Sequence, residues 1–352
     1  MQRDDLVGAV QAAYEARTPL RLRGAGSKDF YGGVLAGEVL DLAAYCGVVA
    51  YEPTELYVTA RCGTPLRELE AVLAERGQML ACEPPRFAGA TVGGAVAAGL
   101  SGPRRQQAGA VRDFVLGVQL IDGTGQWLNF GGQVMKNVAG YDVSRFMAGS
   151  LGTLGVIAEV TLKVLPLAVA ETTLVFACDA SAAIQRLNQW GRQALPISAS
   201  FWQAGQLHVR LSGAAAAVLA ARRQLGGEVA VDGENWWISV REQTQPAFAG
   251  TPLWRLALPS TAPDLPLAGL QAMEWGGGLR WYGPDAGEAV AIRAAATAAG
   301  GHAVLYRAAE SQRCRDGVFA PLNPALLALH RRLKKVFDPR GILNPGRLYA
   351  EF

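Results

Sequence analysis

The hydrophobic positions near the start of the chain follow first a helical and then a strand spacing. Leu6, Val10 and Ala13 recur at intervals of three and four residues, which predicts an amphipathic helix over residues 4–17. Residues 20–23 alternate leucine with arginine, which predicts a short strand. That strand leads directly into a glycine-rich segment.

A second strand and helix are predicted further along. Residues 56–62 alternate apolar and polar side chains, as expected of a half-buried strand. Thr64 is suited to cap the helix that follows, with Pro65 in the first helical position, and Gly77 is expected to end it. The apolar stripe of this helix consists of Leu66, Leu69 and Leu73.

More strands follow before the composition changes. Residues 111–130 indicate two strands joined by a turn at Asp122-Gly123-Thr124-Gly125. Residues 154–165 indicate another strand, which Pro166 interrupts.

After about residue 168 the glycine motifs become rare. Short strands alternate with alanine-rich helices near residues 213–225 and 285–299, and residues 322–337 predict one more helix. We therefore divide the chain into a first domain of residues 1–167, a cap-like domain of residues 168–320 and a C-terminal segment of residues 321–352.

Composition narrows the class of protein. The 352 residues are 50% hydrophobic and 18% charged, which suits a globular protein with more than one core. The formal net charge of +3 is too small to indicate nucleic-acid binding. We find no apolar signal core at the start and no apolar run that could span a bilayer. We therefore expect a cytoplasmic protein.

The five cysteines are scattered, odd in number and without a C-x-x-C pair, which argues against a disulfide framework or an iron–sulfur site. We expect them to be small buried hydrophobic residues. They are Cys46, Cys62, Cys82, Cys178 and Cys314.

Three glycine-rich segments indicate a ligand. The first is Arg23-Gly24-Ala25-Gly26-Ser27-Lys28, directly after a predicted strand. Glycine lets the backbone turn sharply and present N–H groups to an anion such as a pyrophosphate, and Arg23 or Lys28 could add charge. The alternative is a plain tight turn.

The second segment runs from Thr91 to Gly99 and follows Glu83-Pro84-Pro85. Thr91 is expected to cap a helix that Gly93 and Gly94 open with almost no side-chain bulk. A helix start of this kind suits contact with a phosphate or a flavin. Close packing of the helix on a sheet is the alternative.

The third segment joins Lys136-Asn137-Val138-Ala139-Gly140-Tyr141-Asp142 to residues 149–157, where glycine recurs every third position. Val156 and Ile157 begin a strand whose backbone could contact the edge of a planar ring. Close backbone packing alone is the alternative. The sequence lacks a Rossmann fingerprint, a Walker A lysine and a nucleophile elbow, so these segments indicate another kind of cofactor site.

The order of the three segments resembles the FAD-binding domain of the vanillyl-alcohol-oxidase, or PCMH-type, family. The resemblance covers residues 1–167, and residues 337–348 are similar to the tail that returns to that domain. It implies an α+β fold, with a two-subdomain PCMH-type FAD-binding domain and a smaller α+β cap domain. It also implies FAD as the cofactor, with its pyrophosphate at the first two segments and its flavin and adenosine beside the third.

The cofactor-binding residues that we expect are Arg23, Gly24, Ala25, Gly26, Ser27, Pro84, Thr91, Gly93, Gly94, Gly140, Tyr141, Asp142, Gly149, Gly152, Gly155, Val156 and Ile157.

Histidine restricts the chemistry. Many family members tether FAD to a histidine of the FAD domain, but the three histidines here, His208, His302 and His330, all follow residue 200. We therefore expect non-covalent FAD, although composition leaves a cysteinyl link open. The metal-binding G-D-G-N-x-H and E-H-G segments of related hydroxy-acid dehydrogenases are absent, so we expect no metal, and the catalytic residues remain unknown.

Three further features admit two interpretations each. His302 is expected to be a core or surface residue and Arg307 a surface arginine, with a catalytic or carboxylate-binding role as the alternative. The tryptophans after residue 200 are expected to pack in a core rather than line a ligand pocket. The basic cluster 330–335 is expected to be a solvated face, with docking to an acidic partner or an anionic membrane as the alternative.

Within the family, residues 51–56, 134–142 and 149–157 resemble the FAD-binding subunits of bacterial glycolate oxidases. The resemblance implies a complex with a larger FAD-containing D-type subunit and an iron–sulfur F-type subunit, which oxidises glycolate to glyoxylate and passes electrons towards quinone. In that case the larger subunit oxidises glycolate and the present chain holds a second FAD. The alternatives are an assembly subunit with a vestigial flavin site and a stand-alone FAD-dependent hydroxy-acid oxidase.

Overall fold

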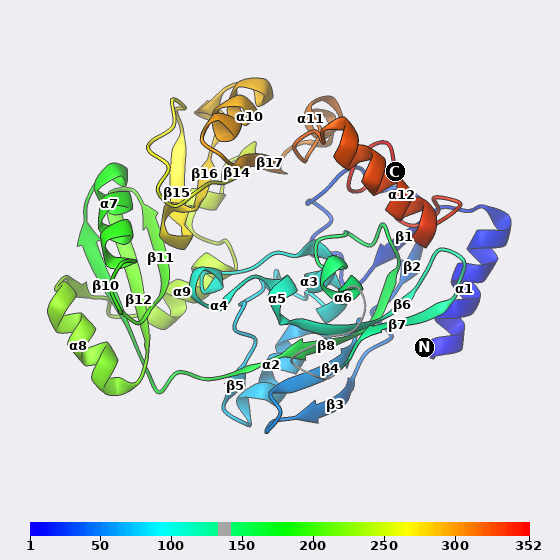
Figure 1. Ribbon diagram of the computed structural model, residues 1–352, viewed down its shortest axis with the longest axis horizontal. Coiled ribbons are helices and arrows are strands. Elements are labelled where there is room, and N and C mark those ends of the chain that lie inside the picture. Colours follow the sequence, from blue (N-terminus) through cyan, green and yellow to red (C-terminus); the bar gives the residue numbers. More distant parts are fainter. Residues whose placement is uncertain (133–141) are drawn as a thin grey trace.

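The computed structural model describes residues 1–132 and 142–352. Figure 1 shows two sheet-containing domains side by side, with the C-terminal helix lying against the first domain. In the described residues, five antiparallel strands form the main sheet of the first domain in the order β3-β4-β8-β6-β7. These strands are β3 (Val48–Glu52), β4 (Tyr57–Arg61), β8 (Val156–Lys163), β6 (Val115–Ile121) and β7 (Trp127–Gly131).

Strand β4 is buried on both faces, so the expectation of a half-buried strand is wrong. Val58 and Ala60 pack in one core, and the alternate residues Tyr57 and Thr59 are also buried. The hydroxyl groups of Thr59 and Thr161 lie 2.9 Å apart across β4 and β8. Polar residues can occupy the second face because they bond to each other there.

The helices of the first domain are α1 (Arg3–Ala16), α2 (Leu66–Ala74), α3 (Val92–Ala98), α4 (Arg105–Ala108), α5 (Val111–Phe114) and α6 (Val143–Phe146). The leucine stripe of α2 is buried as predicted. The predicted cap of α2 is wrong by one residue, because Pro65 occupies that position. The Thr64 hydroxyl instead bonds to the backbone of Gly47, at 2.9 Å from its nitrogen and 3.1 Å from its oxygen.

In the described residues, the second domain contains one sheet of eight strands, which differ in length. Their order is β13 (Glu228–Val229), β10 (Ala170–Ala177), β12 (Gln206–Gly213), β11 (Ile197–Gln203), β15 (Leu270–Glu274), β16 (Leu279–Tyr282), β14 (Leu253–Ala257) and β17 (His302–Arg307). The helices are α7 (Ala180–Trp190), α8 (Ala215–Leu225), α9 (Gly233–Arg241), α10 (Ala289–Ala298) and α11 (Glu310–Asp316), with 3₁₀ turns at Pro246–Phe248, Trp275–Gly277 and Pro284–Ala286.

An aromatic core joins the two domains. Tyr31 and Leu100 of the first domain pack in one cluster with Phe201, Trp281 and Tyr306 of the cap sheet. Trp237 and Trp275 are buried in the same cluster, and Trp254 in another, which confirms core packing for these tryptophans. The other face of the cap sheet packs against α7, α8 and α10.

The C-terminal segment returns to the start of the chain. Helix α12 (Pro324–Phe337) leads to a tail that runs beside β1 (Leu20–Arg23), which itself pairs in parallel with β2 (Glu38–Asp41). The Leu20 N–H donates to Ile342, and the Asn344 N–H donates back to the Leu20 carbonyl. Strands β5 (Gln78–Met79) and β9 (Leu165–Pro166) form a small separate pair.

The cysteines are all free thiols, but the expectation of burial is only partly met. Cys62 and Cys82 are buried, Cys178 is half-buried, and Cys46 and Cys314 are exposed. Across residues 1–132 and 142–352, we find no helix with both the length and the apolar character needed to cross a membrane.

Candidate cofactor site

The glycine-rich segments predicted to bind a cofactor meet in one cleft of about 820 Å³ between β1, α3 and the start of β8. Many of the expected residues line this cleft: Arg23, Gly24, Ala25, Gly26, Ser27, Thr91, Gly93, Gly94, Gly152, Gly155 and Ile157. Segments far apart in the sequence therefore form a single concave site, as small-molecule sites usually do.

The first segment leaves no room for side chains at its glycines. A Cβ atom at Gly24 would lie 2.5 Å from the Thr91 hydroxyl oxygen. Gly26 has a φ of +73°, and a Cβ atom there would lie 2.6 Å from the Arg23 guanidinium. Glycine is required at both positions, so the backbone of this turn stays open towards the cleft.

Gly93 and Gly94 have different roles. The Thr91 hydroxyl accepts a hydrogen bond from the Gly94 N–H at 3.3 Å and caps α3, as predicted. A Cβ atom at Gly93 would lie 2.5 Å from Cβ of Cys62, so close packing explains Gly93. At Gly94 the nearest atom to an added Cβ is the Thr91 hydroxyl oxygen at 3.2 Å, and this position faces the cleft.

The residues of the third segment face two different cavities, the cleft and a separate groove. Gly152 has a φ of +72°, and a Cβ atom there would lie 2.7 Å from the Asn344 amide nitrogen. Ile157 lines the cleft, whereas Val156 is fully buried beneath it. Gly149 lies in a separate groove on the other side of the segment.

The structure does not bring every expected residue to the cleft. Asp142 lines the separate groove with Gly149, and its carboxylate caps α6 by accepting from the Arg145 N–H at 3.3 Å. Pro84 is absent from the lining of the cleft in the described residues. Gly140 and Tyr141 lie outside the described residues.

Two further basic residues line the cleft: Lys28, which the sequence offered as a possible charge, and Arg347, which was not predicted. The Lys28 ammonium nitrogen is buried and has no hydrogen-bond partner in the described part of the chain. Burial lowers the pKa of Lys28 to about 8, although Glu242 acts to raise it. Arg347 donates to the Lys28 and Asp29 carbonyls at 3.1 and 3.2 Å, and burial lowers its pKa to about 10. Sequence signals existed, since Lys28 ends the first segment and Arg347 lies in the tail.

This arrangement fits the diphosphate of FAD. Arg23, Lys28 and Arg347 surround a cleft whose glycine-rich walls leave backbone N–H groups accessible. Lys28 also lines the cleft, and its ammonium is buried 5.5 Å from the centre of the Phe87 ring, so it adds positive charge beside the cleft. The Asn344 side chain closes one wall, because it accepts from the Leu22 N–H at 2.8 Å and donates to the Leu151 carbonyl at 2.7 Å.

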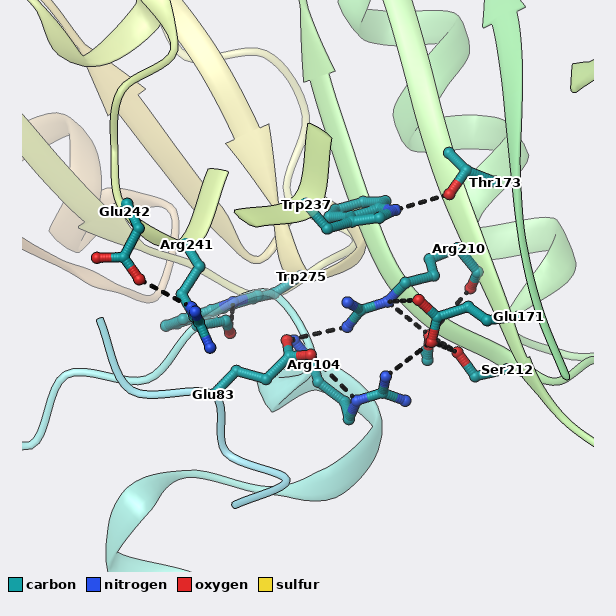
Figure 2. A network of polar contacts seen from close by, with 12 residues as sticks. Glu83, Arg104, Glu171, Thr173, Arg210, Ser212, Trp237, Arg241, Glu242 and Trp275 are labelled. Carbon is teal, nitrogen blue, oxygen red and sulfur yellow. Dashed lines mark hydrogen bonds and ion pairs between the residues drawn. The ribbon is translucent and has the colours of Figure 1, made fainter. Parts of the chain in front are cut away.

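Ion pairs hold the Glu83-Pro84-Pro85 segment against the cap domain (Figure 2). The Glu83 carboxylate accepts from Arg210 of β12 at 2.9 Å and from the Arg104 N–H at 2.8 Å. Arg104 in turn donates to Glu171 of β10 at 2.9 Å. Burial acts to raise the pKa of Glu83, but the two guanidinium groups hold it below the ordinary value. We call these four residues, Glu83, Arg104, Glu171 and Arg210, the interdomain clasp.

None of the three histidines lines the cleft. His208 is stacked on Trp236 at 3.7 Å between ring centres, and burial lowers its pKa to about 4. His302 is exposed at the start of β17, and His330 lies in the separate groove. Arg307 is half-buried and donates to the Phe248 carbonyl at 2.7 Å, so the expectation of a plain surface arginine is wrong.

Comparisons with known proteins indicate the same cofactor. A family model described as FAD binding domain matches residues 2–131, and one described as FAD linked oxidases, C-terminal domain, matches residues 318–348. Glycolate oxidase subunit GlcE of Escherichia coli (strain K12) is 48% identical over 98% of this chain and 97% of that protein. Glycolate oxidase subunit GlcD of Bacillus subtilis (strain 168) is 27% identical over 49% of this chain and 37% of that protein.

Solved structures support the fold alone. Substrate-bound p-cresol methylhydroxylase superposes with a TM-score of 0.71 at 13% identity, and the match covers 100% of this chain and 88% of that one. An alkyldihydroxyacetonephosphate synthase gives a TM-score of 0.64 at 15% identity, over 97% of this chain and 74% of that one. With the fold, the cleft and the relatives in agreement, the chain belongs to the family of the glycolate oxidase subunit GlcE, among the FAD-linked oxidases with a PCMH-type FAD-binding fold.

Proposed function

We propose that the chain is the FAD-binding subunit of a complex that oxidises glycolate to glyoxylate. The observation that carries the proposal is the glycine-lined cleft with Arg23, Lys28 and Arg347 in its walls, in a chain that is 48% identical to a glycolate oxidase subunit over nearly its whole length. FAD in this cleft supplies a two-electron acceptor that can release electrons one at a time.

The residues of the chain bind and orient the cofactor without a covalent link. Arg23, Lys28 and Arg347 neutralise the diphosphate, and the backbone of the first segment donates N–H groups to it. Gly94 keeps the approach free of bulk, and Asn344 fixes the returning tail against the wall of the cleft. The interdomain clasp holds the Pro84 segment beside the cap domain.

Glycolate itself reacts, in this proposal, in a larger FAD-containing D-type subunit. The aromatic core around Tyr31, Trp281 and Tyr306 packs part of the contact between the two domains, and none of the three histidines lines the cleft, which supports a chain that holds a second FAD for electron transfer. Electrons then pass to an iron–sulfur F-type subunit and on to quinone. The complex sits in the cytoplasm or at the cytoplasmic face of the inner membrane.

The variant Gly94→Trp in the reconstituted complex tests the proposal. We expect it to lose about one FAD per complex and at least about tenfold of the glycolate-dependent quinone reduction, because the indole fills the approach to the diphosphate. Gly8→Trp is the control, since a Cβ atom at Gly8 meets nothing within 4 Å. Absorbance of released flavin and circular dichroism establish flavin content and folding.

Two other results would replace the proposal. Full quinone reduction by a folded Gly94→Trp complex that lacks this FAD would make the chain an assembly subunit. Oxidation of glycolate or another 2-hydroxy acid by the isolated chain would make it a stand-alone oxidase.

A further inference from the structure

The polarity of helix α12 is reversed with respect to the domain on which it packs. The one fully buried residue of this helix is Lys334, whose ammonium donates to the Thr153 carbonyl at 2.7 Å and to Asp338 at 2.8 Å. Leu326, Leu329 and Val336 are instead 45%, 51% and 71% exposed. A helix in water normally turns its apolar side chains inwards, so this arrangement indicates a second surface to be covered.

Four apolar residues of α12 form a narrow line, whereas Leu327 and Phe337 are half-buried outside it. Leu326, Leu329, Leu333 and Val336 are spaced by three, four and three residues, which is the repeat of a seam between two packed helices. We call them the α12 stripe. Arg332 and Lys335 are exposed on its solvent side, and α12 contains no acidic residue. Figure 1 places this helix at the rim of the first domain, beside the C-terminus.

A groove of about 1190 Å³ adjoins the stripe and shares Leu333 with it. Phe146, which is 45% exposed, and Arg145 line the same groove. The groove is also close to the cofactor cleft. Gly149, Ser150 and Thr153 line the groove, whereas Leu151 and Gly152 of the same segment line the cleft.

We propose that the α12 stripe and this groove dock an amphipathic helix of a partner subunit, with an apolar seam against the stripe and acidic side chains facing Arg332 and Lys335. This inference rests on the proposed function, because it assumes a complex. The docked helix is separated from the cofactor cleft by the single segment 149–153, which suits an electron-accepting partner.

Charge and shape favour this occupant over two others. A second copy of the chain would bring its own Arg332 and Lys335 against the same residues, and like charges repel. An anionic membrane would complement the charges, but a bilayer surface cannot enter a groove, and the stripe is narrower than the apolar face of a typical interfacial helix.

Co-purification tests the inference. The full chain carries a tag and is expressed with the D-type and F-type subunits, either as wild type or as Leu326→Glu/Leu329→Glu. We expect the double variant to retain its FAD and melting temperature but to lose at least about tenfold in affinity for its partners. Val290→Glu is the matched control, because Val290 is 80% exposed on α10, away from the stripe.

A second variant, Arg332→Glu/Lys335→Glu, tests the acidic character of the partner. We expect this variant to assemble more weakly. High salt should reduce the affinity of the wild-type chain for its partners but not that of the variant, because repulsion replaces attraction. The isolated chain is also mixed with vesicles of phosphatidylcholine and phosphatidylglycerol. If the wild type binds them, and this variant does not bind them but still assembles, the stripe is instead a membrane contact.

The outcomes separate the two proposals. Normal assembly of both stripe variants overturns the inference and leaves the proposed function standing. Failure of the wild-type chain to assemble with either subunit overturns both. If the isolated chain forms dimers and the stripe variants do not, the stripe is an interface between two copies of the chain.

Discussion

Lys28 makes FAD binding sensitive to pH. Its ammonium is buried without a hydrogen-bond partner in the described residues, 5.5 Å from the centre of the Phe87 ring, and burial lowers its pKa to about 8. A bound diphosphate favours the protonated form, so the pKa of Lys28 rises on binding. We expect FAD affinity to be highest below pH 8 and to fall as the pH rises through that value, by up to about tenfold per unit.

The variant Lys28→Met isolates this effect. It should bind FAD about tenfold more weakly at pH 7 and lose the dependence above pH 8, since a hydrogen bond to a charged group contributes about 1.5–3 kcal/mol. Fluorescence titration with FAD measures both, with the exposed Lys335→Met as control. Identical pH curves for wild type and Lys28→Met would remove Lys28 from the site.

At the residue scale, the sequence identified the glycines but not why each of these positions requires glycine. Gly93 and Gly94 share one motif, yet only the neighbouring Cys62 explains Gly93. Lys28 and Arg347 reach the same cleft from positions more than 300 residues apart, a pairing that no local pattern contains. The cofactor contacts of Pro84, Asp142 and Gly149 remain predictions.

At the scale of the element, a buried ion pair anchors the end of α12. Lys334 and Asp338 form it at 2.8 Å, and Asp338 also accepts from the N–H groups of Ile342 and Leu343 at 3.0 and 2.7 Å. Lys334→Met would leave the Asp338 carboxylate buried without a counter-charge. We expect a loss of about 3–5 kcal/mol in the free energy of unfolding, measured by urea titration.

The neighbouring Lys335 provides the control. Its side chain is exposed, so Lys335→Met should change the free energy of unfolding by no more than about 0.5 kcal/mol. Equal losses in both variants, or none in Lys334→Met, would show that the buried pair does not hold the helix.

Periodicity predicted several elements near their observed bounds, including α1, β7 and α12, but residues 111–114, which were expected to begin a strand, form the helix α5. It failed where a partner in space decides the outcome. Thr64 bonds to Gly47 rather than capping α2, and β4 is covered on both faces. The spacing of α12 predicted a helix, but not that Lys334 would be buried while Leu326 and Leu329 are exposed.

At the scale of the whole molecule, the interdomain clasp links two cores. Glu83 lies between Arg104 and Arg210, whose side chains are only 7% and 5% exposed. We expect Glu83→Gln to destabilise the protein by about 3–5 kcal/mol at pH 7, because two buried guanidinium groups then share Glu171 alone. Thermal melts measure the loss. The control is Glu234→Gln, because Glu234 is an exposed carboxylate that lines the same interdomain cavity as Glu83.

The pH dependence of the clasp has a definite sign. The pKa of Glu83 is lower in the folded state than the ordinary value of 4.5, so its contribution is full above that pH and is lost as the pH falls through the folded value. The difference between wild type and Glu83→Gln should therefore shrink in acid. If the difference in stability between wild type and Glu83→Gln stays constant from pH 7 to strong acid, the charge of Glu83 in the clasp is not the origin of that difference.

The domain boundaries near residues 167 and 320 remain predictions from the change in composition, and no pattern in the sequence predicted the contact between the two sheets. The partners in the clasp are separated by 67 and 127 residues, and each looks like an ordinary surface charge in the sequence. Their burial follows from the way the cap sheet packs on the first domain, which is a property of the assembled fold.

The return of the tail to β1 has a consequence for the order of synthesis. Asn344 bonds to Leu22, 322 positions earlier, and Arg347 completes the cofactor cleft from near the last residue. A ribosome that has made the first domain has therefore made only part of the cleft, and its exit tunnel still encloses the missing wall when the cap domain emerges. The cleft is therefore complete only after the tail has folded back onto β1, and contacts this distant in sequence form slowly. We expect a chain truncated before Asn344 to lose its flavin.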